Sequence, residues 1–150
     1  MKRFLGSYTG GIDKKGRVSI PSAFRALVPE GTSLILLPSH KAACIQGFTE
    51  EQFSKLEDSM DRMALFSPEE VAMANALFAK AGYCAPDKEG RCVLREDHIR
   101  HAGLREGETV LFVGLRNRFE IWEPSAHEKH YVAQIAQAAL LTSGIPQVAS

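Results

Sequence analysis

A five-residue pattern that occurs twice constrains the fold of this chain more than any other feature. Asp13-Lys14-Lys15-Gly16-Arg17 is followed 74 positions later by Asp87-Lys88-Glu89-Gly90-Arg91. After each copy come, in the same order, a Glu-Gly step, a four-residue apolar run and a second strand-like stretch. Because a repeat of this kind indicates duplicated structural units, the 150 residues predict two tandem, similar halves.

Each repeat has the pattern of strand, turn, strand, short helix, strand, turn, strand and longer helix. Aspartate at the first position and glycine at the fourth favour a type I turn in which Gly16 and Gly90 take a positive φ. The side chains of Asp13 and Asp87 can close such a turn by accepting a hydrogen bond from a nearby backbone N–H. We therefore expect these four residues to orient the two loops.

Capping signals predict a pair of helices between the repeats. Thr49 with Gln52 has the spacing of a capping box and begins the first helix. Ser67 followed by Pro68 begins the second helix, and Gly82 is its expected end.

A last helix closes the chain. Ser125 with Glu128 is its expected start, and the apolar residues Tyr131, Ile135 and Ala139 suggest that it packs on another helix. The segment that begins at Thr142 is typical of a frayed tail. The resulting division is a first repeat at 4–54, a helical linker region at 55–80, a second repeat at 81–127, and a C-terminal helix and tail at 128–150.

Charge is distributed unevenly, although the formal net charge is zero. Residues 1–28 contain six cations and one anion, a net charge of +5, whereas residues 49–75 contain seven anions and two cations, a net charge of −5. The basic segment is typical of a surface that binds nucleic acid. The acidic segment is either a solvated helix face or a contact for the basic segment of a neighbouring subunit.

The two loop arginines are the main candidates for function. A guanidinium just beyond the tip of a glycine turn can project from a rigid support toward a phosphate group or the O6/N7 edge of guanine. Arg17 and Arg91 are both in this position. The alternative is that each arginine merely pairs with the aspartate of its own turn, as exposed ion pairs often do.

Cysteine and histidine usage argues against a disulfide framework and against a metal site. The three cysteines form no C-x-x-C pair, so we expect buried, reduced thiols. Cys84, Cys92, His98 and His101 lie close in sequence, but their spacing matches no compact zinc finger. No run of about 18 apolar residues and no secretory signal occurs, so cytoplasm is the expected compartment, with no membrane partner.

Several further motifs, together with the doubled loop, resemble the MraZ family over nearly the whole chain. They are Phe4-Leu5-Gly6, Ile20-Pro21, His101-Ala102-Gly103-Leu104 and Asn117-Arg118-Phe119-Glu120-Ile121-Trp122. The resemblance implies a mixed α/β fold of the AbrB-like swapped-hairpin superfamily, in which the two halves form one intertwined β-barrel unit. It also implies a ring-shaped homo-oligomer and a transcriptional regulator of the nucleoid. The family's regulators bind short G-rich direct repeats in double-stranded DNA upstream of the division and cell-wall gene cluster.

The resemblance assigns DNA contact to the arginine of each loop. The neighbouring cations complete the predicted DNA-binding set, which is Arg17, Lys14, Lys15, Arg3, Arg91 and Lys88. The second copy departs from the family pattern, because Cys92 follows its arginine and Arg95 stands where the first repeat has Pro21. In a ring, several weak loops would engage consecutive DNA repeats and gain avidity.

Two other classes of function remain as alternatives. An enzyme would use Asp13, Asp87 and a histidine, but each aspartate lies in a turn beside a cation, and no nucleophile constellation or phosphate-binding glycine loop is present. A structural or partner-binding ring, such as an antitoxin-like module of the same superfamily, would bind no specific DNA. The sequence thus predicts a DNA-binding regulator that is not an enzyme and needs no cofactor, metal ion or small-molecule substrate.

Overall fold

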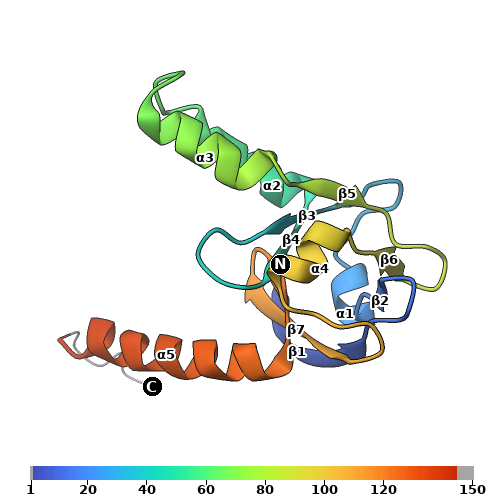
Figure 1. The fold of residues 1–150 in the computed structure, drawn as a ribbon. Helices are drawn as coiled ribbons and strands as arrows, with labels where there is room; N and C mark the ends of the chain where they lie inside the picture. The colour runs from blue at the N-terminus through green and yellow to red at the C-terminus, as the bar shows by residue number, and fades with distance from the viewer. Residues whose placement is uncertain (1, 145–150) are drawn as a thin grey trace.

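The computed structural model describes residues 2–144 and has a mixed α/β fold (Figure 1). The elements follow the order predicted for two repeats separated by a helical connection. They are β1 (Phe4–Gly11), β2 (Arg17–Ser19), α1 (Ser22–Arg25), β3 (Leu34–Pro38), β4 (Ile45–Thr49), α2 (Glu50–Met60), α3 (Pro68–Phe78), β5 (Gly82–Cys84), β6 (Arg91–Val93), α4 (Glu96–His101), β7 (Thr109–Arg116), β8 (Phe119–Trp122) and α5 (Pro124–Thr142).

Both sheets combine strands from the two repeats. The larger sheet is antiparallel and has the order β1-β7-β8-β4-β3-β5, and the smaller sheet is a two-stranded ribbon of β2 and β6. Each strand of the first repeat has a counterpart in the second repeat whose number is higher by four. Exchanging all counterparts gives the same two sheets, with each strand order counted from the opposite edge. The two repeats are therefore related by an approximate two-fold symmetry whose axis passes between β4 and β8 and between β2 and β6.

The strands β1 and β5 are the edges of the larger sheet. The sheet is therefore open, and the closed, intertwined barrel that the resemblance implies stays a prediction. The boundary expected at residue 54 falls inside α2, and the strand pairing joins the two repeats through shared sheets. Among residues 2–144, no helix combines the length and the hydrophobicity that crossing a bilayer requires.

The alternation of side chains along β3 shows how the core is layered. Leu34 and Leu36 lie in the main core cluster, whereas Ile35 and Leu37 lie in a second cluster with residues of α2 and α3. Successive residues of a strand point to opposite faces, so β3 is covered on both sides. The main cluster lies between the larger sheet and the β2–β6 ribbon with its short helices, and it fixes the ribbon against the body of the protein.

The helix starts predicted between the repeats are confirmed. The Thr49 hydroxyl accepts a hydrogen bond from the Gln52 backbone N–H at 3.2 Å, and the Ser67 hydroxyl accepts one from the Glu70 N–H at 3.1 Å. The predicted end of α3 was wrong, because the helix ends at Phe78 and Gly82 already belongs to β5.

The predicted start of the last helix was also wrong. Helix α5 begins at Pro124, and the carboxylate of Glu123 accepts the capping bond from the Ala126 N–H at 2.8 Å. Ser125 lies in the first turn instead, where its hydroxyl donates to Glu123. Proline pre-forms the first helical turn, so Pro124 was the stronger start signal.

Two helical arms project from the body (Figure 1). The hairpin of α2 and α3 forms one arm, and α5 forms the other, with no buried residue along its 19-residue length. Tyr131 and Ile135 are 52% and 51% exposed. The apolar residues of α5, which were expected to pack on another helix, are therefore not buried by any part of the chain that the structure describes. The predicted tail falls mainly on 145–150, which lie outside the described residues.

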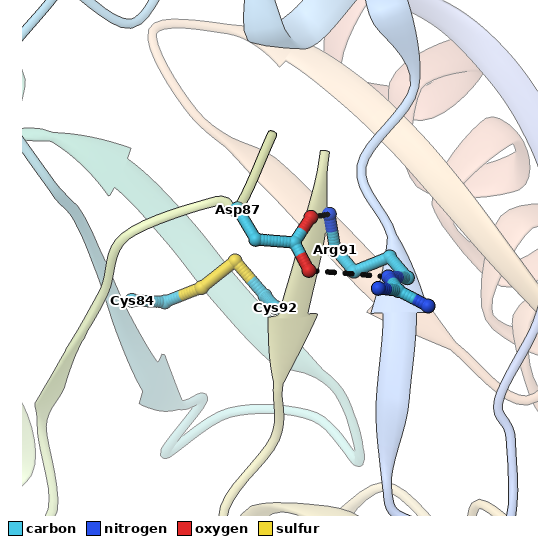
Figure 2. The surroundings of a disulfide bond; sticks show 4 residues. All are labelled: Cys84, Asp87, Arg91 and Cys92. Carbon is cyan, nitrogen blue, oxygen red and sulfur yellow. Dashed lines mark hydrogen bonds and ion pairs between the residues drawn. A yellow bond between two sulfur atoms is a disulfide. The ribbon is translucent and has the colours of Figure 1, made fainter. Parts of the chain in front are cut away.

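The expectation of reduced cysteines was wrong for one pair. Cys84 and Cys92 form a disulfide bond with their Cα atoms 5.9 Å apart, and Cys44 is free and buried (Figure 2). The bond links β5, an edge of the larger sheet, to β6 of the ribbon, and it spans the second Asp-Lys-x-Gly-Arg loop. The fold brings these two positions, eight residues apart in the sequence, close together, and counting cysteines or looking for C-x-x-C pairs does not reveal this proximity.

Candidate nucleic-acid interface

The first loop forms the turn that its residues predict. The Gly16 N–H donates to the Asp13 carbonyl oxygen at 3.0 Å, and Gly16 has a φ of +77°. The Asp13 carboxylate accepts hydrogen bonds from the backbone N–H groups of Lys15 and Arg17, both at 2.9 Å. The second loop repeats this geometry, with a φ of +81° at Gly90. The loop-orienting role of both glycines and both aspartates rests on these bonds.

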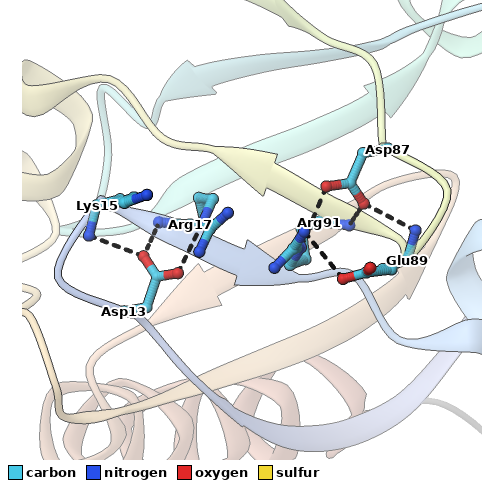
Figure 3. A network of polar contacts seen from close by, with 6 residues as sticks. All are labelled: Asp13, Lys15, Arg17, Asp87, Glu89 and Arg91. Carbon is cyan, nitrogen blue, oxygen red and sulfur yellow. Dashed lines mark hydrogen bonds and ion pairs between the residues drawn. The ribbon is translucent and has the colours of Figure 1, made fainter.

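Each loop arginine is also paired with its own aspartate. Nε of Arg17 donates to Oδ2 of Asp13 at 2.7 Å, and Nε of Arg91 donates to Oδ2 of Asp87 at 3.1 Å (Figure 3). In both turns the pKa of the aspartate is lowered, first by the backbone N–H of the arginine. The ion pair within each loop, the alternative to a DNA contact, is therefore present. The aspartate, however, occupies only the Nε edge of each guanidinium.

The remaining nitrogens distinguish the two arginines. Among residues 2–144, the two Nη atoms of Arg17 have no hydrogen-bond partner. Nη2 of Arg91 lies 2.9 Å from a carboxylate oxygen of Glu89, which occupies the position of Lys15 in the second loop. Arg17 thus has two donors available for an external acceptor, whereas Arg91 is held between two carboxylates.

The β2–β6 ribbon places both arginines on one face. Arg17 lies opposite Val93 and Arg91 lies opposite Ser19, while Val18 and its partner are buried beneath them. Figure 3 shows the two guanidinium groups in the middle of the ribbon, with Asp13 and Asp87 toward its two ends. We call this outward surface, formed by the two loops and the exposed side chains of β2 and β6, the ribbon face.

Reciprocal hydrogen bonds fix each loop to the other repeat. The Ile20 N–H donates to the Gly90 carbonyl, and the Leu94 N–H donates to the Gly16 carbonyl, both at 2.8 Å. Because each turn is anchored to the strand that follows the other turn, the two arginines hold a defined spacing on a rigid support. Such preorganisation is what a recognition surface requires.

Charge is unequal across the ribbon face. The first loop contains three cations and one anion, a net charge of +2, and the second contains two of each, a net charge of zero. Lys14, Lys15 and Lys88 are all exposed. The geometry is therefore that of a shallow, rigid surface with positive charge concentrated at one end, which suits contact with an extended polyanion.

Known proteins match most of this chain. A family model for the MraZ protein, described as antitoxin-like, matches residues 3–75 and 77–143. The chain belongs to the MraZ family. It is 41% identical to Transcriptional regulator MraZ of Gluconacetobacter diazotrophicus, over 86% of this chain and 84% of that protein. Proteins of the same name from Gluconobacter oxydans and Rickettsia akari are 39% and 34% identical, over 97% and 87% of this chain and 92% and 87% of those proteins.

The two matches to the MraZ model coincide with the two structural repeats, so each repeat carries one copy of the family's loop. Five of the six residues predicted to bind DNA lie in the two loops: Lys14, Lys15, Arg17, Lys88 and Arg91. The sixth, Arg3, precedes β1, whose eight residues separate it from the first loop by about 23 Å of extended strand.

Two further arginines lie near the ribbon face. Arg25 is the last residue of α1, its side chain lies against Gly90, and its Nε donates to the Ile20 carbonyl at 3.1 Å. It was not singled out from the sequence. Its place in the basic segment was the available signal. Arg95, which stands where the first repeat has Pro21, is bound to Asp97 by two hydrogen bonds at 3.0 and 2.9 Å.

The histidines considered for a zinc site contact backbone carbonyls. Nε2 of His98 lies 2.6 Å from the Lys80 carbonyl oxygen, and Nε2 of His101 lies 3.0 Å from that of Ala42. Cys84 and Cys92 are joined to each other. Within residues 2–144, no group of three or more histidine, cysteine, aspartate or glutamate side chains could hold a metal ion.

Proposed function

We propose that this chain is a sequence-specific DNA-binding transcriptional regulator whose ribbon face contacts double-stranded DNA. The observation that carries the proposal is the pair of arginines on the β2–β6 ribbon, of which Arg17 has two free Nη donors beside Lys14 and Lys15. The name Transcriptional regulator MraZ, borne by relatives over most of the chain, supports the same function.

The chemistry of the ribbon face fits the major groove of DNA. The groove admits a two-stranded β-ribbon, and an arginine donates in a bidentate manner to O6 and N7 of guanine. Arg17 is therefore the base-reading residue, which accounts for a preference for short G-rich direct repeats in the promoter of the division and cell-wall genes. Lys14, Lys15 and Lys88 contact phosphates, and Arg91 makes a weaker contact. Arg3, at the opposite end of β1 from the first loop, stays a predicted DNA contact outside this face.

The helical arms supply the contacts for a ring-shaped homo-oligomer. Phe66 and Leu65, at the tip of the α2–α3 hairpin, are 80% and 72% exposed, and Leu140 and Leu141 on α5 are 71% and 67% exposed. Apolar side chains exposed on projecting elements favour association with another chain. A ring built from intertwined barrel units in the nucleoid of the cytoplasm would present several ribbon faces to consecutive DNA repeats and raise the affinity through avidity.

A second function is favoured by the same exposed arms. A partner-binding, antitoxin-like ring would use the apolar arms to hold another protein and would bind no specific DNA. The description of the matching family as antitoxin-like supports this alternative. Both proposals describe a binding protein rather than an enzyme, and DNA binding separates them.

The test measures binding of the purified protein to a G-rich direct repeat and to a scrambled duplex, by fluorescence anisotropy over a range of salt concentrations. We expect tighter binding to the repeat and a steep fall in affinity as salt rises. Arg17→Ala should weaken specific binding about 10- to 100-fold, Arg91→Ala less, and the exposed hairpin variant Arg62→Ala not at all.

Native mass measurement of each variant separates contact from folding. We expect Arg17→Ala to assemble normally. If it dissociates while its assembled fraction still binds DNA normally, Arg17 is structural. Equal binding of the wild type to both duplexes reduces the function to nonspecific DNA binding, and no binding to either duplex favours the partner-binding ring.

A further inference from the structure

A cationic cleft lies at the start of β1, remote from the ribbon face. It has a volume of about 820 Å³ and is enclosed by the segment before β1, the first turns of α2 and the turn between β7 and β8. Its charged lining residues are Lys2, Arg3, Lys55, Arg116 and Glu51. The function proposed above assigns no role to this cleft.

The charge of the cleft is opposite to that of the neighbouring helix. Four cations face one carboxylate, a net charge of +3 on the lining, although the segment 49–75 that contributes α2 is acidic. Lys55 pairs with Glu51 at 3.8 Å, with both side chains more than 60% exposed. An exposed pair at this distance neutralises little charge, so the cleft keeps a positive potential.

Arg116 occupies an unfavourable backbone conformation at the rim of the cleft. Its φ is +69°, in the left-handed region that disfavours residues with a Cβ. The turn is closed by a hydrogen bond from the Leu115 N–H to the Arg118 carbonyl oxygen at 2.8 Å, and glycine would adopt it without strain. Strained residues of this kind cluster at ligand-binding sites, and here the strain places a guanidinium on the lining.

The other walls favour a phosphate group attached to an apolar moiety. Thr49, Glu51 and Gln52 belong to the beginning of α2, so the positive end of the dipole of this 11-residue helix adds to the charge of the four cations. Leu27, which is partly exposed, supplies apolar surface beside them, whereas Phe4 is almost fully buried and contributes little. The volume lies within the range of small-ligand pockets, and arginine with lysine is the usual set of cations for phosphates.

We propose that this cleft binds a small molecule with two or more phosphate groups, of the nucleotide class, as an effector site separate from the DNA-binding ribbon. The phosphates lie between Arg116, Lys2 and Lys55, and the nucleoside lies toward Leu27. A duplex backbone presents the same phosphate chemistry from a different source, so the experiment must separate the two.

Isothermal titration calorimetry of the assembled full-length chain uses ATP, GTP and tripolyphosphate as probes and adenosine as the phosphate-free control. We expect one site per protomer for each polyphosphate and none for adenosine. Arg116→Gln should weaken binding at least tenfold, and Arg105→Gln, an exposed arginine outside the cleft, should bind like the wild type. Absence of binding by all three polyphosphates at millimolar concentration, or equal affinity of Arg116→Gln, overturns the proposal.

Two further variants keep this inference separate from the proposed function. The double variant Arg17→Ala/Arg91→Ala should keep polyphosphate binding, since loss of binding would mean that the ribbon face holds the probe. Arg116→Gln should keep DNA binding, and a weakened DNA complex would mean that the cleft holds the duplex backbone. Arg116→Gly removes both the backbone strain and the guanidinium, so this variant should unfold at a higher temperature without ligand and should bind polyphosphate weakly. Unchanged polyphosphate binding would mean that Arg116 serves the turn and does not bind the ligand.

Discussion

Exchange of one residue between the two loops tests the ribbon face most directly. The loops differ at their third position alone, where the first has Lys15 and the second has Glu89. Both residues use their backbone N–H to bond the turn aspartate at 2.9 Å, so the side chain is not needed for the turn. Glu89→Lys therefore gives the second loop the sequence of the first, and Lys15→Glu does the reverse, without loss of either turn.

The size of the effect follows from electrostatics. Two unit charges about 6 Å apart in water interact by roughly 0.7 kcal/mol. Reversing the sign of one charge changes this by roughly 1.4 kcal/mol, or about tenfold in affinity per protomer at low salt. Screening at physiological salt reduces the factor to about threefold. Glu89→Lys also removes the carboxylate 2.9 Å from Nη2 of Arg91 and frees a donor for DNA.

The assay is the affinity for a G-rich repeat measured as a function of salt concentration. We expect Glu89→Lys to bind more tightly and to steepen the slope of log K against log salt by about 0.9 for each added phosphate contact, and Lys15→Glu to do the opposite. Glu57→Lys carries the same charge change on the remote α2 and is the matched control. An unchanged slope in both loop variants would refute the ribbon face as the DNA interface, and a response to Glu57→Lys equal to that of Glu89→Lys would show a nonspecific charge effect.

Three further predictions concern the scaffold. Gly47→Ala should lower the free energy of unfolding by about 1–3 kcal/mol in chemical denaturation, because the added Cβ would overlap the ring of Phe119. Gly11→Ala is the control, since its Cβ would make only an ordinary contact, and equal unfolding midpoints for the two variants would contradict this packing. Reduction of the Cys84 disulfide should lower the free energy of unfolding by about 2.5 kcal/mol, and Cys84→Ser should be insensitive to reductant; a wild type equally insensitive would show that the bond does not stabilise the fold. The lowered pKa of Asp13 means that its stabilising bonds are complete at neutral pH and are lost as the pH falls below 3.8 through the folded-state pKa; a carboxyl titration by NMR with a midpoint above 3.8 would exclude this.

The sequence predicted what short-range chemistry determines. The two turns and the N-caps Thr49 and Ser67 follow from local rules for dihedral angles and hydrogen bonding, and the structure has each of them. The element order within each repeat was predictable for the same reason, because it depends on hydrophobic periodicity along a continuous segment.

Contacts between distant segments were not predictable from the sequence alone. The pairing of β2 with β6 joins residues about 74 positions apart, and no local signal specifies it. The same pairing buries Cys92 beneath the ribbon face. The disulfide depends on this tertiary arrangement, whereas the contact of Glu89 with Arg91 lies within one loop and follows from their spacing of two residues. Arg3 was grouped with the loops by its charge and is separated from them by the length of β1.

Approximate symmetry explains why small differences between the loops matter. Two identical repeats would present two equivalent guanidinium groups, related by the axis between β2 and β6, and each would have the same access to DNA. Glu89 and the disulfide instead act on one copy: the carboxylate occupies Arg91, and the covalent bond restrains the loop around it. The first loop keeps its donors free, so each ribbon face has a direction. A directed face suits direct repeats better than inverted ones, because in the proposed ring every protomer would meet the DNA in the same orientation.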